Sequence, residues 1–593
     1  MQILPRGWDR RYFLAVCSRA GFAGTLFPGV LFAMAESKPA ITRDMIDNAA
    51  AIAGIQIADE YKDMMLADLN TQVKDYAKIR DLHLANSVGS AVDFNPVLPG
   101  MKFESAKRPM RMSAATAGDV PKNVEELAFA SVRQLGELVR ARKVTSTALT
   151  EMYLTRLKRY DPLLKFVITY TEDRALAQAK EADKEIASGK YRGPLHGIPW
   201  GAKDMLATKG YKTTWGAGGF ENQTIDEDAT VVQRLDKAGA VLVAKLTLGA
   251  LAMDDGWFGG MTRNPWKPEQ GSSGSSAGPG SATSAGCVAF AMGSETLGSI
   301  SSPSTRCGTT GLRPTFGRIP RTGAMALAYS MDKLGPMCRS VEDCALVLDA
   351  IYGPDGKDRT VHDVPFNWDA NLDIRKLRIG YLKASFEELP KAEEKPETAT
   401  PEEEKKQAEE RARRMEQRKL DDASLKVLQD KLGLKLTEAK LPDLPWASML
   451  SILTAECSAS FDELTRSGRD RLLTGQKKTD WPNYFRIGRF VPAVEYINAN
   501  RARLLGMEAM AKAFADFDVI VTPTLDDQLV ITNLTGYPAL ILPNGFHPDG
   551  TPGSLTFLGQ LFGEAKLLAV AKAYQDATDW HRKHPVLAPG VNK

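Results

Sequence analysis

Apolar and polar positions follow different patterns in successive parts of the chain. Between residues 40 and 90, apolar side chains recur every three or four positions, which predicts helices, and Gly54 separates two of them into a hairpin. Residues 91–121 carry several prolines and no periodic pattern, which indicates a connecting strap. We therefore predict a helical segment with its strap over residues 36–121 and one large domain over residues 122–593.

The large domain alternates between helical patterns and short apolar runs. The runs "KFVITYT" (165–171) and "AVLVAKL" (240–246) have the composition of buried strands, and helical patterns lie beside them. This alternation predicts an α/β fold with a central mixed β-sheet that helices cover on both faces.

A charged insert over residues 387–421 interrupts this alternation with almost no apolar side chains. Such a stretch could contact a partner or a nucleic acid. More often it forms a solvated helix with Glu–Lys pairs four residues apart, and we favour that interpretation.

Charge and cysteine usage narrow the classes of function. The 593 residues include 76 basic and 73 acidic ones, a net charge of +3, so nothing indicates a nucleic-acid partner. The six cysteines contain no CxxC pair and the six histidines no HExxH motif, so we expect no metal site.

The first 35 residues have the layout of an export signal. Arg10 and Arg11 precede a mildly apolar run that ends in Ala-Met-Ala at 33–35, as in a twin-arginine signal peptide over residues 1–35. A membrane anchor or a buried helix is the alternative, but Arg19 and several Gly and Pro residues interrupt the run. We expect a periplasmic or secreted protein with no stable membrane association after signal cleavage.

The stretch "GSSGSSAGPGSATSAG" (271–286) has the composition of a flexible linker. It is no phosphate-binding loop, because a Walker A motif needs a lysine and none occurs between residues 268 and 306. The dinucleotide motif GxGxxG is also missing, since Thr283 takes the place of its third glycine. We therefore expect no cofactor.

A hydrolase elbow is another interpretation of the same stretch. Residues 274–278 match GxSxG with Ser276 as nucleophile, and His581 would be a late histidine partner for it. That motif needs a strand directly before it, whereas Pro265 and Pro268 exclude a central strand there.

Several separated motifs account for the stretch better. "GPLHGIPWGAKDML" (193–206) contains Lys203, and "GSETLGSI" (293–300) contains Ser299, which follows Ser275 by 24 residues. "TRNPW", "VTPT" and "NLTGYPALILPNG" are further motifs of this kind. Over about residues 123 to 580 the chain resembles the amidase signature family, serine hydrolases of amides.

This resemblance implies a Ser–cis-Ser–Lys mechanism. Ser299 would attack the amide carbonyl, and its proton would pass through Ser275 to Lys203. The peptide bond before the bridging Ser275 is cis in the family. A lysine serves as a base only when neutral, which burial favours by lowering its pKa.

The resemblance also implies further site residues. The backbone N–H groups of Thr296, Leu297 and Gly298 would form the oxyanion hole. Position along the chain suggests that the pocket is lined by the loop at 525–537 and by three other residues: Met253, Asp254 and Trp257.

Three positions depart from the family pattern. Ala277 replaces a glycine just after the two serines. Leu297 replaces a glycine in the oxyanion turn, so its backbone must avoid positive φ or bear strain. Ser301 replaces an arginine that some members use to hold an anionic substrate, which argues against a small acidic amide.

The function we expect is hydrolysis of a linear amide, either a small molecule or a peptide amide, by a stand-alone amidase. One alternative is a glutamine amidotransferase A-subunit-like protein, because residues 40–85 resemble the small helical subunit of that complex. Export would separate such a protein from tRNA and ATP. The other alternative is a non-catalytic binding protein. The sequence leaves the oligomeric state open, a homodimer included.

Overall fold

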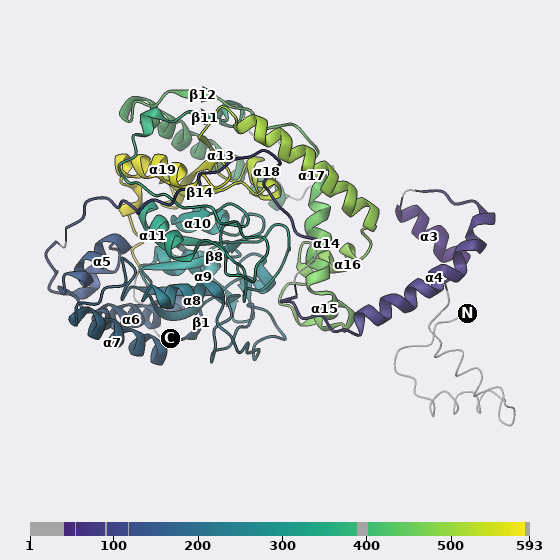
Figure 1. Ribbon diagram of the computed structural model, residues 1–593, viewed down its shortest axis with the longest axis horizontal. Coiled ribbons are helices and arrows are strands. Elements are labelled where there is room, and N and C mark those ends of the chain that lie inside the picture. Colours follow the sequence, from purple (N-terminus) through teal and green to yellow (C-terminus); the bar gives the residue numbers. More distant parts are fainter. Residues whose placement is uncertain (1–40, 54, 89–91, 117, 388–400, 588–593) are drawn as a thin grey trace. The chain divides into compact units, whose positions relative to one another are not determined.

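The computed structural model describes residues 41–53, 55–88, 92–116, 118–387 and 401–587 (Figure 1). The signal peptide expected at residues 1–35 lies outside these residues. The chain divides into two compact units, with the division between Leu84 and Ala85. In the described part, no helix combines the length and the apolar character that a membrane crossing would need.

The first unit contains the predicted pair of helices, α3 (Arg43–Ala53) and α4 (Asp59–Arg80). Gly54, expected between them, lies outside the described residues. Helix α3 buries Ile46 and Ala50. Lys62 of α4 forms an ion pair of 2.6 Å with Asp47 of α3, which joins the two helices, and another of 2.6 Å with Asp59 of its own helix.

An eleven-stranded sheet forms the centre of the second unit, in the order β1-β3-β2-β8-β10-β9-β14-β15-β13-β11-β12. Strand β2 is parallel to β3 and β8, whereas β10 is antiparallel to β8 and β9, so the predicted mixed sheet is confirmed. The strands are β1 (Val167–Tyr170), β2 (Pro199–Lys203), β3 (Val241–Leu246), β8 (Phe290–Glu295), β9 (Thr310–Arg313), β10 (Lys333–Cys338), β11 (Ile379–Tyr381), β12 (Leu436–Glu438), β13 (Val519–Pro523), β14 (Ala539–Phe546) and β15 (Pro552–Gly559).

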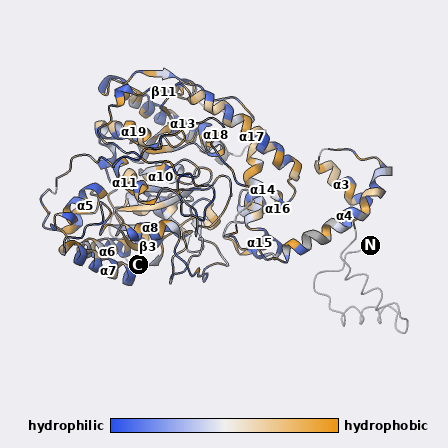
Figure 2. Ribbon diagram, in the orientation of Figure 1, coloured by the Kyte–Doolittle hydropathy of each residue, from blue (hydrophilic) through white to orange (hydrophobic). Residues whose placement is uncertain are grey.

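Alternation along the strands gives the sheet two apolar faces. On β14, Leu540 and Leu542 belong to one hydrophobic core, whereas Ala539 and Ile541 belong to another. Successive side chains of a strand point to opposite faces, so helices must cover both. The helices with one face toward these cores carry hydrophobic and hydrophilic positions side by side (Figure 2).

The helices of this unit follow the predicted alternation. Helix α7 packs on β3, α11 on β10, and α19 on β14 and β15. The helices are α5 (Val132–Arg140), α6 (Ser146–Leu164), α7 (Glu172–Ala187), α8 (Thr230–Lys237), α9 (Ala277–Ser284), α10 (Ser301–Cys307), α11 (Val341–Ile351), α12 (Lys383–Glu387), α13 (Pro401–Lys426), α14 (Ser451–Ser460), α15 (Asp462–Arg466), α16 (Trp481–Gly488), α17 (Ala493–Phe514), α18 (Gln528–Thr535) and α19 (Glu564–Thr578).

The strap at residues 91–121 belongs to the second unit, although the sequence pattern grouped it with the N-terminal helices. Met101 and Phe103 pack against one core of that unit, and Met110 packs against the other. The N–H of Ser113 donates a hydrogen bond of 2.7 Å to the Glu342 carboxylate. Apolar side chains spaced without a period are thus enough to fix an extended segment along a folded domain.

The charged insert forms helix α13, and its residues 388–400 lie outside the described ones. The prediction of a solvated helix holds for most of the described insert residues, which are exposed or half-buried, whereas Asp421 at the C-terminal end of the insert is buried. Leu420 packs against Gly545 and Gly553, and a Cβ at either glycine would approach the Leu420 side chain within 2.7 Å. The two glycines face each other on β14 and β15 and leave room for Leu420, and beside them the Asn544 amide donates a hydrogen bond of 2.8 Å to Asp421.

Candidate active site

Lys203 ends strand β2, which lies between β3 and β8 in the sheet, and its side chain is fully buried. Its Nζ lies 2.8 Å from the hydroxyl of Ser275, 3.0 Å from that of Ser276 and 2.8 Å from that of Ser294. These hydroxyls are its only hydrogen-bond partners among the described residues. The fold therefore brings the predicted lysine and the predicted bridging serine into direct contact.

Burial lowers the pKa of Lys203 well below its ordinary value, although the nearby carboxylates of Asp332 and Glu295 oppose this shift. No carboxylate lies within 4 Å of its Nζ in the described part of the chain. Hydroxyl groups stabilise an ammonium much less than a carboxylate does, so the neutral amine is favoured. A neutral, buried lysine is competent as a general base.

The hydrogen bonds of Ser276 restrict how the amine is oriented. The Ser276 hydroxyl donates to the carbonyl of Ser294 at 3.1 Å and accepts from the N–H of Ser294 at 3.1 Å. Because its one proton is committed, it can only accept from Lys203. A neutral amine has two N–H groups and one lone pair, so one N–H and the lone pair remain for Ser275 and Ser294. The lone pair is thus able to take a proton from Ser275.

The loop that carries Ser275 is packed closely against the chain around Asp254. The Gly274–Ser275 peptide bond is cis, as the resemblance implies. A Cβ at Gly274 would lie 1.8 Å from the carbonyl oxygen of Asp254, so only glycine fits there. Ala277, where the family has glycine, is the buried first residue of α9, and α-helical backbone suits alanine well.

Ser299 lies in the turn before α10 and is 9% exposed. Its carbonyl accepts a hydrogen bond of 3.1 Å from the N–H of Ser276, which joins this turn to the Ser275 loop. Its hydroxyl makes no hydrogen bond with another described residue. Contacts of this kind often form only when substrate binds, so the free hydroxyl is compatible with a nucleophile.

The turn before Ser299 presents unused hydrogen-bond donors. The backbone N–H groups of Thr296, Leu297 and Gly298 donate to no acceptor among the described residues, and neither does the N–H of Ser299. Buried N–H groups usually have a hydrogen-bond acceptor, so a turn with several free donors is unusual. An oxyanion hole requires donors of this kind. Of these residues only Gly298 has a positive φ, +89°, so Leu297 replaces the family's glycine without backbone strain.

The residues predicted to bind substrate are divided between two environments. Asp254 is exposed, and its backbone lies against Gly274. Met253 is half-buried against the hydrophobic core, and Trp257 is buried, in edge contact with Phe258. Of the three, only Asp254 has an exposed side chain.

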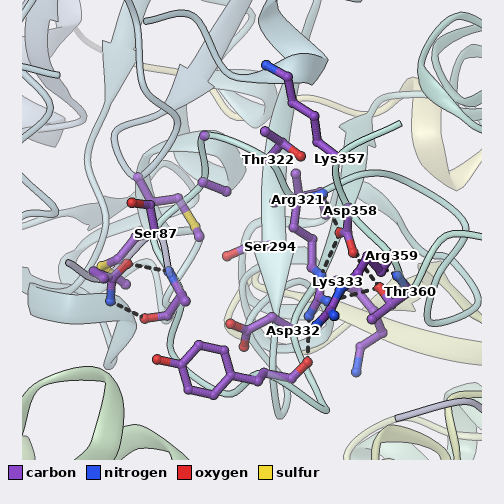
Figure 3. A pocket seen from close by; sticks show the side chains of 18 of the residues that line it. Ser87, Ser294, Arg321, Thr322, Asp332, Lys333, Lys357, Asp358, Arg359 and Thr360 are labelled. Carbon is purple, nitrogen blue, oxygen red and sulfur yellow. Dashed lines mark hydrogen bonds and ion pairs between the residues drawn. The ribbon is translucent and has the colours of Figure 1, made fainter. Parts of the chain in front are cut away.

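Two cavities border this machinery. The first, of about 530 Å³, has Ser294 and Asp332 among its lining side chains (Figure 3). Asp332 accepts a hydrogen bond of 2.6 Å from the Thr296 hydroxyl. This cavity thus reaches both the Lys203 network and the oxyanion turn from the side of strands β8 and β10.

The second cavity, of about 1000 Å³, is lined by residues of α13 and by residues between Pro523 and Val530. These overlap the start of the loop predicted at 525–537, most of which is helix α18 instead. Its Leu529 side chain lies 3.4 Å from the position that a Cβ on Gly298 would take. Met253, Asp254 and Trp257 line neither cavity.

The hydrolase-elbow interpretation is wrong. Among the described strands, the one before Ser276, β7 (Lys267–Gly271), pairs only with β6 (Arg263–Asn264) in a separate two-stranded sheet. Ser276 is fully buried, and its hydroxyl proton is used by Ser294. No hydrogen bond joins His581 to Ser276 in the described part of the chain. Ser276 nevertheless belongs to the site, because its hydroxyl accepts a hydrogen bond of 3.0 Å from Lys203.

The sequence motifs did not predict the contacts of three further residues of the site. Ser294 contacts Lys203, Asp332 holds Thr296, and Glu295 accepts hydrogen bonds from the start of α10. Among the described residues, no group of three or more His, Cys, Asp or Glu side chains is arranged to hold a metal.

Comparison with known proteins agrees with this geometry. The family model described as Amidase matches residues 148–528. The chain belongs to the amidase family. It is 34% identical over 499 residues to the A subunit of the glutamyl-tRNA(Gln) amidotransferase of Thermosynechococcus vestitus, covering 76% of this chain and 98% of that protein. It is also 34% identical over 513 residues to the corresponding protein of Roseiflexus castenholzii, covering 77% of this chain and 97% of that protein.

Among solved structures, the native peptide amidase of Stenotrophomonas maltophilia aligns with a TM-score of 0.64 and 29% identity, covering 77% of this chain and 98% of that one. The mixed α/β fold and the predicted amidase signature resemblance are confirmed. As a member of the amidase family, the chain is an enzyme that acts on carbon–nitrogen bonds.

Proposed function

We propose that this amidase hydrolyses a carboxylic amide through a serine acyl-enzyme, with Ser299 as nucleophile, Ser275 as bridge and Lys203 as base. The observation that carries the proposal is the contact of 2.8 Å between Lys203 and Ser275, inside a network without a counter-ion. The unused N–H groups of the turn at Ser299 support it independently.

In this mechanism Lys203 takes the proton of Ser275 while Ser275 takes that of Ser299. The Ser299 oxygen then attacks the carbonyl carbon, and the N–H groups of Thr296, Leu297 and Gly298 stabilise the oxyanion. When the C–N bond breaks, the proton returns through Ser275 to the leaving amine. Water cleaves the acyl-enzyme by the same relay and releases the carboxylic acid.

The substrate class we propose is a neutral amide, an amidated peptide or an aryl amide. Ser301, at the position where some members carry arginine, donates its hydroxyl to Glu295 at 2.9 Å and offers no cation to an anionic substrate. The structural likeness to a peptide amidase points the same way. Asp254, exposed beside the Ser275 loop, is the residue we assign to substrate contact, and Met253 and Trp257 would support its segment.

A second candidate is an amidotransferase A-subunit-like activity, which the names of the relatives favour. The two-helix N-terminal segment would then stand for a helical partner subunit. Ammonia release from glutamine separates the candidates: an amidotransferase of this kind turns over glutamine in preference to amidated peptides, and the proposed amidase does the reverse.

We also propose export through the twin-arginine signal at residues 1–35, which rests on the sequence alone. Replacing Arg10 and Arg11 by lysine should retain the protein in the cytoplasm of a bacterial host. Equal distribution of both proteins between cell fractions would contradict export.

The direct test of the mechanism is labelling with a fluorophosphonate probe, followed by intact-mass measurement and peptide mapping. A single adduct on Ser299 that disappears in Lys203→Ala is the expected result. An adduct on another serine, or undiminished labelling without Lys203, would reject the assignment. No adduct would favour a binding protein with the fold of an enzyme.

A further inference from the structure

Glu295 holds the segment that contains Ser299 at both of its ends. It is the last residue of β8 and fully buried. Its Oε2 accepts hydrogen bonds from the N–H of Ile300 at 2.9 Å, from the N–H of Ser301 at 2.8 Å and from the Ser301 hydroxyl at 2.9 Å. The Glu295 side chain thus connects the residue before the oxyanion turn to the two residues after Ser299.

The other carboxylate oxygen connects this loop to helix α18. Oε1 accepts from Arg313 at 2.9 Å and from the Asn533 amide at 2.8 Å. Arg313 in turn donates to the Thr532 hydroxyl at 2.7 Å and to the carbonyl of Tyr537 at 3.1 Å. One carboxylate with five donors therefore ties the Ser299 turn to two other parts of the fold.

The partners of this carboxylate favour its ionised form. Burial alone would raise the pKa of Glu295, but Arg313 and the other donors lower it to about 2. The charge of Asp332 raises the pKa of Lys203, and the charge of Glu295 raises it further. Burial raises the pKa of the Asp332 carboxyl itself, so its charge is less firmly fixed.

Other charged groups surround these two. Lys333 faces Glu295 across the β8–β10 pair, and burial lowers the pKa of that lysine well below its ordinary value. On the far side of β2, Asp204 is neutralised by Lys245 at 2.8 Å. On the side of the nucleophile, Glu295 is paired with the Arg313 guanidinium at 2.9 Å.

We propose that Glu295 is a positioning residue for amide hydrolysis, which holds the Ser299 turn in place and supplies a permanent negative charge that lets Lys203 accept a proton. This inference rests on the proposed function. The two roles are separable, because one depends on the length of the side chain and the other on its charge.

Two variants separate the roles. Glu295→Asp keeps the charge but is one methylene shorter, so it cannot reach both sets of donors. Glu295→Gln keeps the length but has no charge, and its amide offers one acceptor oxygen where two are needed. Glu342→Gln is the matched control, since Glu342 is also a buried carboxylate that accepts a backbone N–H, but from Ser113 on the strap.

The experiment measures the rate of fluorophosphonate labelling of Ser299 in the full chain as a function of pH. We expect Glu295→Asp to lower the plateau rate by about 10- to 100-fold without moving the acid limb. Glu295→Gln should lower the plateau and also move the acid limb to lower pH by about one unit, because removing a negative charge disfavours protonated Lys203. Glu342→Gln should change neither.

An acid limb in Glu295→Gln at the wild-type position would overturn the role of the charge. A wild-type plateau in Glu295→Asp would overturn the role in positioning. Circular dichroism establishes that each variant is folded. If Glu295→Gln does not fold, Asn533→Ala removes a single donor, and it should lower the plateau several-fold with the limb unmoved. Absence of labelling at Ser299 in the wild type would instead refute the proposed function before Glu295 is tested.

Discussion

Lys203 and Lys245 lie on the neighbouring parallel strands β2 and β3, and both side chains are fully buried. Lys245 pairs with the Asp204 carboxylate at 2.8 Å and donates to the Thr213 hydroxyl at 2.7 Å. Within the described part of the chain, the Lys203 amine has hydrogen bonds only to hydroxyls. The same residue type in the same sheet therefore forms a structural ion pair in one place and a candidate base in the other. The counter-ion makes the difference.

The largest expected effect comes from Lys203→Met. It removes the base, so Ser299 labelling and amide hydrolysis should fall by roughly 10²- to 10⁴-fold. The free energy of unfolding should not fall, because an apolar side chain replaces a buried amine that has no counter-ion. Labelling kinetics and urea unfolding measure the two effects. Loss of stability together with activity would mean that Lys203 is structural.

Lys245→Met should do the reverse of what Lys203→Met does. It leaves the buried Asp204 carboxylate without its cation, which costs about 3–5 kcal/mol in the free energy of unfolding. The double variant Asp204→Asn/Lys245→Met removes the orphaned charge and should recover part of that loss. Urea denaturation of the three proteins measures this. Equal stability of the single and double variants would show that the ion pair is unimportant.

Ser276→Ala should have an intermediate effect on the Lys203 side of the comparison. It removes the acceptor that fixes one N–H of the amine. We therefore expect labelling of Ser299 to slow by about tenfold, which corresponds to the loss of one hydrogen bond. The adduct should remain on Ser299, as peptide mapping would show. A wild-type rate would mean that Ser275 and Ser294 orient the amine alone.

The smallest effect concerns the pH dependence of stability. The pKa of Lys203 is lowered in the folded protein and ordinary in the unfolded chain, so the unfolded state binds more protons between the two values. The Lys203 contribution to the free energy of unfolding therefore rises with pH over the range below 10.5. The wild-type minus Lys203→Met difference in urea unfolding should rise from pH 7 to pH 9.5. A flat difference would mean that Lys203 is charged in the folded state.

The sequence predicted the fold class from the alternation of helical patterns and apolar runs. It predicted the set Lys203, Ser275 and Ser299 because each residue lies inside a contiguous motif. The periodic patterns likewise predicted α3, α4 and the strands at 165–171 and 240–246. Motifs cannot show which side chains meet across strands, so the contacts of Ser294, Asp332 and Glu295 became visible only in the sheet.

Composition also could not predict that two segments, helix α13 and the strap at 91–121, pack against the rest of the large domain. Helix α13 has the composition of a solvated helix, yet Gly545 and Gly553 leave room for it on the sheet. The strap at 91–121 shows no period because it lies along a surface instead of forming an element of its own. In both cases the information lies in the surface that receives the segment.

Lys203 is the last residue of β2 and Asp204 follows it directly, and the first side chain contacts the serines whereas the second contacts Lys245. Successive residues of an extended chain face opposite ways, so a slip of one residue between β2 and β3 would exchange them. An acid would then face the serines, and two ammonium groups would meet on the other side. The alignment of two strands thus keeps base and counter-ion apart, which makes strand register a chemical property of this enzyme.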